Sequence, residues 1–334
     1  MHSTWLIHLS NGPYWNKIIG TEYTNCRKNW WANLLYINNY IDNENMCMQQ
    51  TWYLASDTQL FLVSLIVLSL IWKFQRYAKI ILGINLIIGM MIPGIVSYVV
   101  QSDIVIRQFP EPLYHLLLKI PHWHLLYASG YSNLGGYAIG LCCGYIYYKN
   151  LNAKINVKKI HVVLWWILSF GLCIFIILIA GIMYKEDFTY SRLGAAFYWS
   201  VGKNLFALGV AIGIYGTTLN IGWFAKWILE LPNVQILGRL TYSTYIVHVA
   251  LAKFRAGTIR SPLFISDYYF FFTAMSDILI SYLVGTMLCI AFEMPISALQ
   301  KIFVPQLSKR KEEDSSEKSL KTVDFSEEEM QTRI

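Results

Sequence analysis

Long apolar stretches separated by short polar segments run along most of the chain. A helix needs roughly 20 mostly apolar residues to cross a bilayer, and seven stretches reach about that length. They lie at about 52–72, 78–100, 131–148, 160–183, 198–219, 234–253 and 269–292. Transmembrane barrels would instead show ~10-residue segments of alternating hydrophobicity, a pattern that this sequence lacks. The pattern predicts an all-α polytopic transmembrane helical bundle with about seven spans.

The apolar pattern stops at both ends of this bundle. Residues 1–51 are rich in aromatic and asparagine side chains but contain no long apolar stretch. From Ser308 onward the chain is strongly charged and has no hydrophobic period. We therefore predict a loop over residues 1–51, a transmembrane bundle over 52–305 and a disordered charged tail over 306–334.

The third stretch is shorter than the others and rich in glycine. Small residues at a helix surface let two membrane helices approach closely. We therefore expect close helix contact, and not lipid, along this stretch at Gly135, Gly136, Gly140 and Gly144.

Composition and charge agree with a membrane protein and predict its orientation. Apolar residues make up 55% of the chain and charged residues only 14%, too few to cover the surface of a soluble domain of this length. Basic residues gather after the first, third and last stretches, which lie on one side; the positive-inside rule makes that side cytosolic. These residues are Lys73, Arg76, Lys79, Lys149, Lys154, Lys158, Lys159, Lys301, Lys309, Arg310 and Lys311.

The predicted orientation places residues 1–51 outside the cell or in a lumen and the charged tail in the cytosol. The chain is thus expected to be a multi-pass protein of the plasma membrane or an endomembrane. The net charge of +7 is then a signal of topology, and no nucleic-acid partner is expected. Lys253, Arg255 and Arg260 do not fit, because they fall on the outer side. They either snorkel from a helix end to the headgroups or form a basic patch for an anionic group.

Two of the six cysteines lie in the outer loop. Cys26 and Cys47 flank the aromatic stretch from Asn29 to Asn39 on the oxidising side of the membrane. Cysteines of exported loops are commonly paired, so we predict a disulfide between them in preference to two free thiols.

The sixth stretch carries a row of polar side chains. Thr241, Thr244, Tyr245 and His248 fall on one helical face, at spacings of three, four and seven. Polar and ionisable groups are costly inside a bilayer and often mark a site. His248 is a candidate base, unless it serves as an interhelical hydrogen-bond partner. Arg239, near the cytosolic mouth, suits a coenzyme A phosphate if it does not simply reach lipid headgroups.

Three acidic residues also lie in or beside apolar stretches. Asp57, near the outer end of the first stretch, is a candidate for orienting a histidine or binding a hydroxyl; a helix cap is the alternative. Asp277 lies inside the last stretch, where a carboxylate needs protonation or a cation, such as Lys203, Arg255 or His248. Glu293 is expected to end the last span and to fix that end structurally through a salt bridge to a neighbouring span.

Several short sequence motifs occur in a particular order along the chain. They are Cys26…Asn29-Trp30-Trp31…Cys47, then Trp52-Tyr53-Leu54-Ala55-Ser56-Asp57-Thr58-Gln59, then Gly140-x-x-x-Gly144-Tyr145, then Leu240-Thr241-Tyr242-x-x-Tyr245-x-Val247-His248, then Ser281-Tyr282, and finally Phe292-Glu293-x-Pro295. In this order and spacing the chain resembles the membrane acyltransferase-3 family, specifically the animal nose-resistant-to-fluoxetine type. The resemblance covers roughly residues 10–305.

The resemblance implies transfer of an acyl group from a cytosolic acyl-CoA-like donor to an acceptor hydroxyl. The donor is a substrate, so no bound cofactor and no metal are expected; the lipid bilayer, the donor and an acceptor are the expected partners. Catalytic roles fall on His248 and Asp57. Substrate-binding roles fall on Arg239, Tyr245 and Thr241, and on Lys203, which stands where the family often carries arginine.

The chain also departs from the family. Members begin with further spans bearing an Arg/His pair, to which catalytic proton transfer is usually assigned, and this sequence starts after that region. A truncated member is therefore expected. The alternative is a catalytically silent protein that binds or moves a lipid or another hydrophobic small molecule. A seven-span receptor is disfavoured, because the third stretch ends Tyr147-Tyr148-Lys149 without the acidic-Arg-aromatic triplet of that class.

Overall fold

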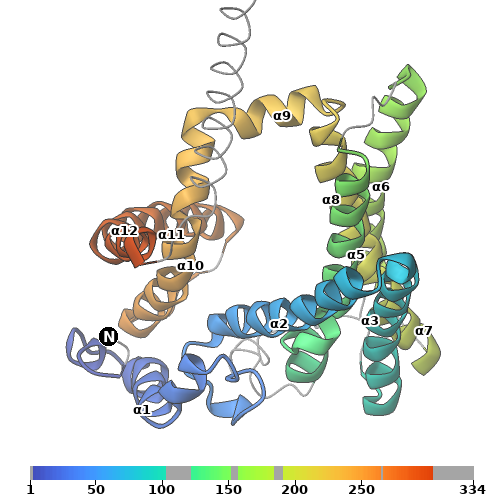
Figure 1. Cartoon of the computed structure of the whole chain (residues 1–334). Helices are drawn as coiled ribbons and strands as arrows, with labels where there is room; N and C mark the ends of the chain where they lie inside the picture. The colour runs from blue at the N-terminus through green and yellow to red at the C-terminus, as the bar shows by residue number, and fades with distance from the viewer. Residues whose placement is uncertain (1–2, 103–121, 152–156, 184–190, 265, 304–334) are drawn as a thin grey trace, which may run out of the picture. The chain divides into compact units, whose positions relative to one another are not determined.

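The computed structural model describes residues 3–102, 122–151, 157–183, 191–264 and 266–303, and the regular elements within these ranges are helices (Figure 1). The all-α prediction is confirmed. The predicted tail, 306–334, lies outside the described residues. The helices are α1 (Thr21–Leu34), α2 (Trp52–Lys73), α3 (Ala78–Val100), α5 (Gly130–Lys149), α6 (Lys159–Met183), α7 (Arg192–Phe197), α8 (Lys203–Thr218), α9 (Trp223–Glu230), α10 (Pro232–Thr258), α11 (Asp267–Leu288) and α12 (Met294–Phe303).

Five helical segments among the described residues are long and apolar enough to cross a membrane, so the protein is an integral membrane protein with several spans. They are Gln49–Lys73, Gln75–Val100, Lys159–Gly181, Arg192–Thr218 and Asp267–Phe303. The other two predicted stretches also form helices, α5 and α10. However, α5 is rich in glycine and tyrosine, and α10 carries three basic residues. The count of seven spans therefore stays a prediction.

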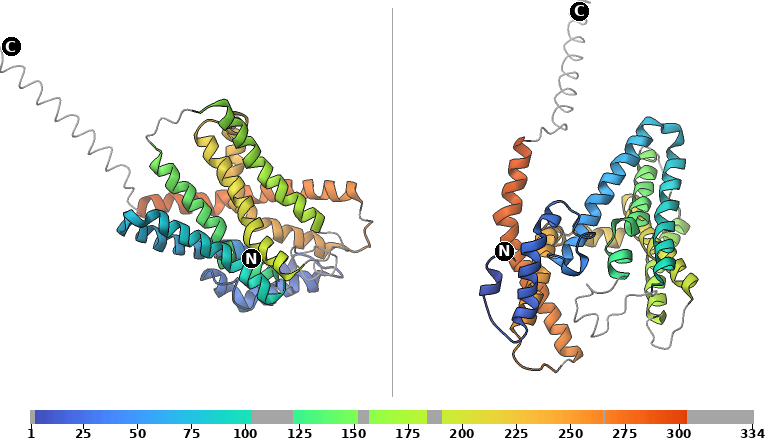
Figure 2. Two further views of the ribbon diagram at one scale, coloured as in Figure 1. Left: turned by 90° about the vertical axis from the view of Figure 1, so that its right-hand side faces the viewer. Right: turned by 90° about the horizontal axis from the view of Figure 1, so that it is seen from below.

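Short π-helical turns join some of these helices into longer ones. Tyr198–Gly202 connects α7 to α8, and Cys289–Glu293 connects α11 to α12 as one continuous helix, seen in both views of Figure 2. The helix therefore continues past Glu293, and the end of the last membrane span at that residue stays a prediction. Pro295 lies inside this continuous helix, two residues after the π-helical turn, and does not end it.

The chain divides into two compact units, and α10 contributes to both. The first unit comprises residues 1–239 and 249–266. The second comprises residues 240–248 and those from 267 onward.

In the first unit, α3, α5 and α8 cross where α5 carries Gly135. A Cβ on Gly89 of α3 would lie 2.6 Å from the backbone nitrogen of Gly135, and a Cβ on Gly135 would clash with the Asn204 side chain of α8. The predicted close contact is thus confirmed at Gly135. It is wrong at Gly140 and Gly144, where an added Cβ would meet nothing within 4 Å.

The N-terminal segment packs against the last two turns of α10. Leu6, Trp15 and Ile19 form a buried cluster, with Trp15 edge-on to Phe254 of α10 at 5.3 Å between ring centroids. Beside it, Lys253 donates to Glu22 at 2.6 Å, and both side chains are only 6% exposed. Both sequence interpretations of Lys253, snorkelling and an anion-binding patch, are therefore wrong.

The loop between α1 and α2 is held by a disulfide and by amide side chains. A disulfide joins Cys26 to Cys47, the two cysteines that the sequence pairs. Glu22 accepts from the Met48 backbone N–H at 2.8 Å, and Asn33 donates to the Cys47 carbonyl at 3.1 Å. The loop is thus tied to α1 along its length.

Loss of the Lys253 ammonium should destabilise the protein. In Lys253→Met the Glu22 carboxylate stays buried without its cation, and the free energy of unfolding should fall by about 3–5 kcal/mol. The double variant Glu22→Gln with Lys253→Met should recover most of that loss, because it removes both charges. Chemical denaturation in detergent measures both. Equal destabilisation by the single and double variants would contradict the ion-pair account.

The loop between α1 and α2 should become less stable in acid. Hydrogen bonds from Lys28, then Asn45 and Asn29, lower the pKa of the Asp42 carboxyl to about 2 from an ordinary 3.8. Because the folded pKa lies below the unfolded one, this stabilisation is complete above about pH 4 and is lost as the pH falls toward 2. Asp42→Asn should show a smaller fall in the unfolding midpoint over that window. Parallel curves for the two proteins would argue against a role for this carboxylate.

Candidate functional site

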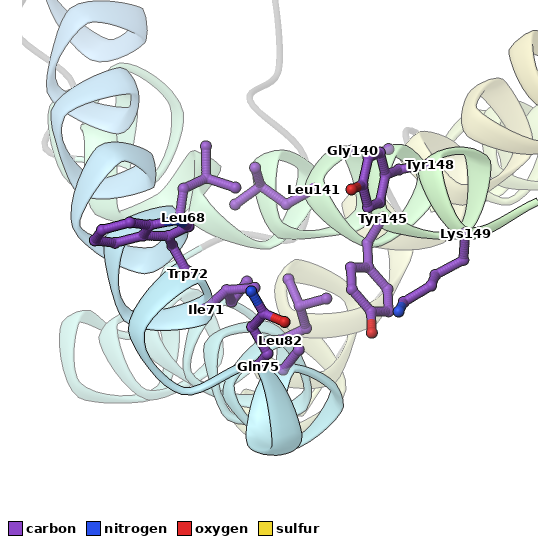
Figure 3. A pocket seen from close by; sticks show the side chains of 12 residues that line it. Leu68, Ile71, Trp72, Gln75, Leu82, Gly140, Leu141, Tyr145, Tyr148 and Lys149 are labelled. Carbon is purple, nitrogen blue, oxygen red and sulfur yellow. The ribbon is translucent and has the colours of Figure 1, made fainter. Parts of the chain in front are cut away.

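A largely apolar cavity of about 450 Å³ lies where the end of α2, the start of α3 and the second half of α5 meet (Figure 3). The volume falls in the range of small-molecule pockets, roughly 300–1,000 Å³. Its lining residues are Leu68, Ile71, Trp72, Gln75, Ala78, Leu82, Gly140, Leu141, Gly144, Tyr145, Tyr148 and Lys149. From the sequence, Gly140 and Gly144 were expected to be points of close helix contact, and the cavity was not predicted.

Glycine makes room for the cavity. Gly140 and Gly144 are four residues apart on α5, so they share one face of the helix. Because neither would bring a Cβ within 4 Å of another atom, their backbone forms part of the wall and the space in front of it stays open. Larger residues at these two positions would fill the cavity.

Polar groups lie at the ends of the three helices that enclose the cavity. Lys149 is the last residue of α5, and its Nζ lies 5.9 Å from the centroid of the Tyr145 ring (Figure 3). Gln75 follows the end of α2. An apolar wall with a cation at its edge fits an amphipathic ligand that has a hydrocarbon part and an anionic head.

Lys203 lies away from the cavity, near the start of α2, among aromatic side chains. Its Nζ is buried and has no hydrogen-bond partner among the described residues, and it lies 5.7 Å from the centroid of the Tyr127 ring. Tyr127 stacks on Trp123 and also contacts Trp52, the first residue of α2. Trp52 and Leu68 are about 24 Å apart along the helix, so this cluster is separate from the cavity.

Asp57 is exposed on α2, as is Tyr53 one turn before it. It makes no hydrogen bond or ion pair within the part of the chain that the structure describes. Ser64, which helical spacing places on the same face, is only 4% exposed. The face of α2 that carries Tyr53, Asp57 and Ser64 is thus exposed near the start of the helix and buried further along.

The polar row on α10 is divided in the structure. His248 is exposed, and its Nδ1 lies 2.6 Å from the Tyr245 carbonyl oxygen. Since a carbonyl only accepts, this contact assigns the proton to Nδ1 and leaves Nε2 as an acceptor. Thr241 is exposed, whereas Thr244 packs against Gly285 of α11, where an added Cβ would lie 2.6 Å from the threonine hydroxyl.

Glu293 and Asp277 belong to the second unit. Glu293 accepts a hydrogen bond from the buried Ser243 hydroxyl of α10 at 2.6 Å, so its partner is a hydroxyl where the sequence predicted a cation. Asp277 is half-buried on α11, and the cation predicted for it stays a prediction.

Arg239 is exposed on α10. Asp57 and His248 lie in different units, so their joint role also stays a prediction.

Comparison with known proteins finds a distant similarity to a curated protein. No protein-family model and no solved structure matches it. Among curated proteins, it is similar to Nose resistant to fluoxetine protein 6 of Caenorhabditis elegans, at 23% identity over 90% of this chain and 37% of the relative. The chain therefore spans little more than a third of that relative's length. The resemblance read from the motifs is confirmed, and the chain is a distant relative of the nose-resistant-to-fluoxetine proteins.

Proposed function

We propose that this chain is part of a membrane acyltransferase, and that its apolar cavity holds the hydrocarbon chain of the acyl donor. The cavity itself carries the proposal, because it combines an apolar wall with a cation at the predicted cytosolic ends of α2 and α5. An acyl-CoA-like donor would enter from that side. The family relationship supports the chemistry, and the cavity supports the substrate class.

The cavity also sets the expected energetics of donor binding. Each CH₂ group moved from water into an apolar site contributes about 0.8 kcal/mol. Two additional buried CH₂ groups would therefore tighten binding by about tenfold, until the cavity is full. The Lys149 ammonium would pair with a phosphate or carboxylate of the same molecule.

In the proposed reaction an acceptor hydroxyl attacks the thioester carbonyl of the donor. A new ester bond forms, the carbon–sulfur bond breaks, and the thiol leaves with a proton. Nε2 of His248 is suited to take the hydroxyl proton, because its lone pair is free when Nδ1 holds the proton. We assign Asp57 to binding the acceptor hydroxyl, and Lys203, Arg239, Tyr245 and Thr241 to binding substrate.

A second candidate function is binding or transport of a lipid without chemistry. One observation favours it: the residues that line the cavity include no histidine and no carboxylate. A ligand held there would need a base from elsewhere in the complete protein before it could react. Binding and turnover must therefore be measured separately.

Filling the cavity should abolish binding of long acyl chains. Gly144→Leu places a side chain into the cavity, whereas Gly83→Leu on α3 adds the same side chain in open space outside the lining. We expect at least a tenfold loss of labelling by a photoreactive long-chain acyl-CoA in the first variant only, about the effect of two lost CH₂ contacts. Equal labelling of both variants would show that the donor binds elsewhere.

Turnover should depend on His248 and Asp57. In the complete protein, His248→Ala and Asp57→Asn should each lower the rate of acyl transfer to a hydroxyl by about 10²–10⁴-fold, the usual contribution of general acid–base catalysis. Labelling by the photoreactive donor should be unchanged, since neither residue lines the cavity. Donor binding with no transfer in the unmodified protein would support the transport function and contradict the catalytic one.

A further inference from the structure

Helix α1 buries polar side chains and exposes apolar ones at its C-terminal end, and Arg27 and Lys28 before that end are exposed as well. Its buried side chains are mostly polar, namely Glu22, Asn25, Cys26, Asn29 and Ala32. Its exposed end is apolar and continues into the two residues after the helix: the α1 tip consists of Trp30, Trp31, Leu34, Leu35 and Tyr36, with exposed fractions between 39% and 69%. A helix in water would place these two groups the other way round.

Two asparagines of α1 bond to the loop that the helix holds. Asn29 donates to the Asn45 carbonyl at 2.9 Å and to Asp42, and Asn33 donates to Cys47 and Thr51. The helix therefore cannot rotate to turn its apolar end inward without breaking these bonds and straining the disulfide. The apolar tip is held outward by the fold of the loop.

Tyr36 adds a second, independent observation. Its φ is 56°, in the left-handed region that bulky residues avoid at a cost of about 1–2 kcal/mol. Glycine would adopt this conformation without strain and is the usual residue just after a helix. Tyr36 nevertheless takes this conformation, and its side chain is 43% exposed beside the other residues of the tip.

The tip lies alongside a membrane span. Gln59 of α2 donates to the Tyr36 carbonyl at 2.8 Å and to Asn39 at 2.8 Å. Asn39 is 1% exposed and donates in turn to the Ala128 carbonyl at 3.1 Å. Gln59 lies seven residues into α2, which is about 10 Å along the helix. The apolar tip is thus clamped to α2 at a depth where the exposed surface of that helix is itself apolar, with Phe61 and Leu62 next along it.

We propose that the α1 tip inserts into the lipid bilayer beside α2, at the level where headgroups meet acyl chains. Tryptophan and tyrosine are the side chains enriched at that level, because their rings are apolar and their N–H and O–H groups can still bond to water or headgroups. The tip contains both, together with two leucines and no charge. The first loop is then an interfacial anchor and not a domain that stands in the aqueous phase.

A fluorescent label tests the position of the tip. The complete protein would carry an environment-sensitive dye at Leu34→Cys, with Cys142, Cys143, Cys173, Cys289 and any further free cysteine replaced, and be reconstituted into phosphatidylcholine vesicles. Quenching by lipids spin-labelled near the headgroup would be compared with quenching by aqueous iodide. Glu44→Cys, an exposed polar position of the same loop, is the matched control. Migration on a non-reducing gel would verify that the Cys26–Cys47 disulfide remains.

We expect the dye at position 34 to be quenched several-fold more by the spin-labelled lipid than the dye at position 44, and the order to reverse for iodide. Two results would overturn the proposal. In one, iodide reaches position 34 as well as it reaches position 44. In the other, neither quencher reaches position 34, which would mean that protein covers the tip. The test uses no acyl donor, so its outcome is independent of the proposed enzymatic function.

Discussion

Polar groups that cannot reach water must find partners inside the protein, and the internal organisation of the first unit depends on this constraint. The Glu22–Lys253 ion pair joins α1 to the end of α10. The amide pair of Asn39 and Gln59 fixes the first loop to α2. Each contact links segments that are distant in the sequence, and each holds a polar side chain away from an apolar exterior. The apolar residues that a soluble protein would bury are left to face outward.

The glycines of α5 show that one residue type can serve two opposite purposes. At Gly135 the missing side chain lets α3 and α8 approach the α5 backbone. At Gly140 and Gly144 the missing side chain leaves a space that forms part of the cavity. The difference lies in what faces each glycine: α3 and α8 at Gly135, and no atom within 4 Å at Gly140 and Gly144. Spacing along α5 alone contains no information about these neighbours.

The sequence predicted what depends on local composition. The apolar stretches identified the membrane class and located the long helices, and the order of motifs led to the resemblance that the distant relative supports. The cavity could not be predicted, because its walls come from three helices. Lys253 was misread because its partner, Glu22, is distant in the sequence. The partner of Glu293 could not be inferred from its motif, because the Ser243 hydroxyl comes from another helix. The candidate catalytic residues were chosen by motif, and their exposure in the structure could not be inferred from spacing.

The ion pair between Glu22 and Lys253 has a consequence for biosynthesis. Its two residues are 231 positions apart, and ribosomes add about 5–20 residues per second. The carboxylate of Glu22 therefore waits on the order of ten seconds or longer for the lysine to be synthesised. During that interval the first loop can close its disulfide and its amide contacts, but its carboxylate has no cation to neutralise it. A chain interrupted before α10 would therefore carry the Glu22 carboxylate without its ion-pair partner.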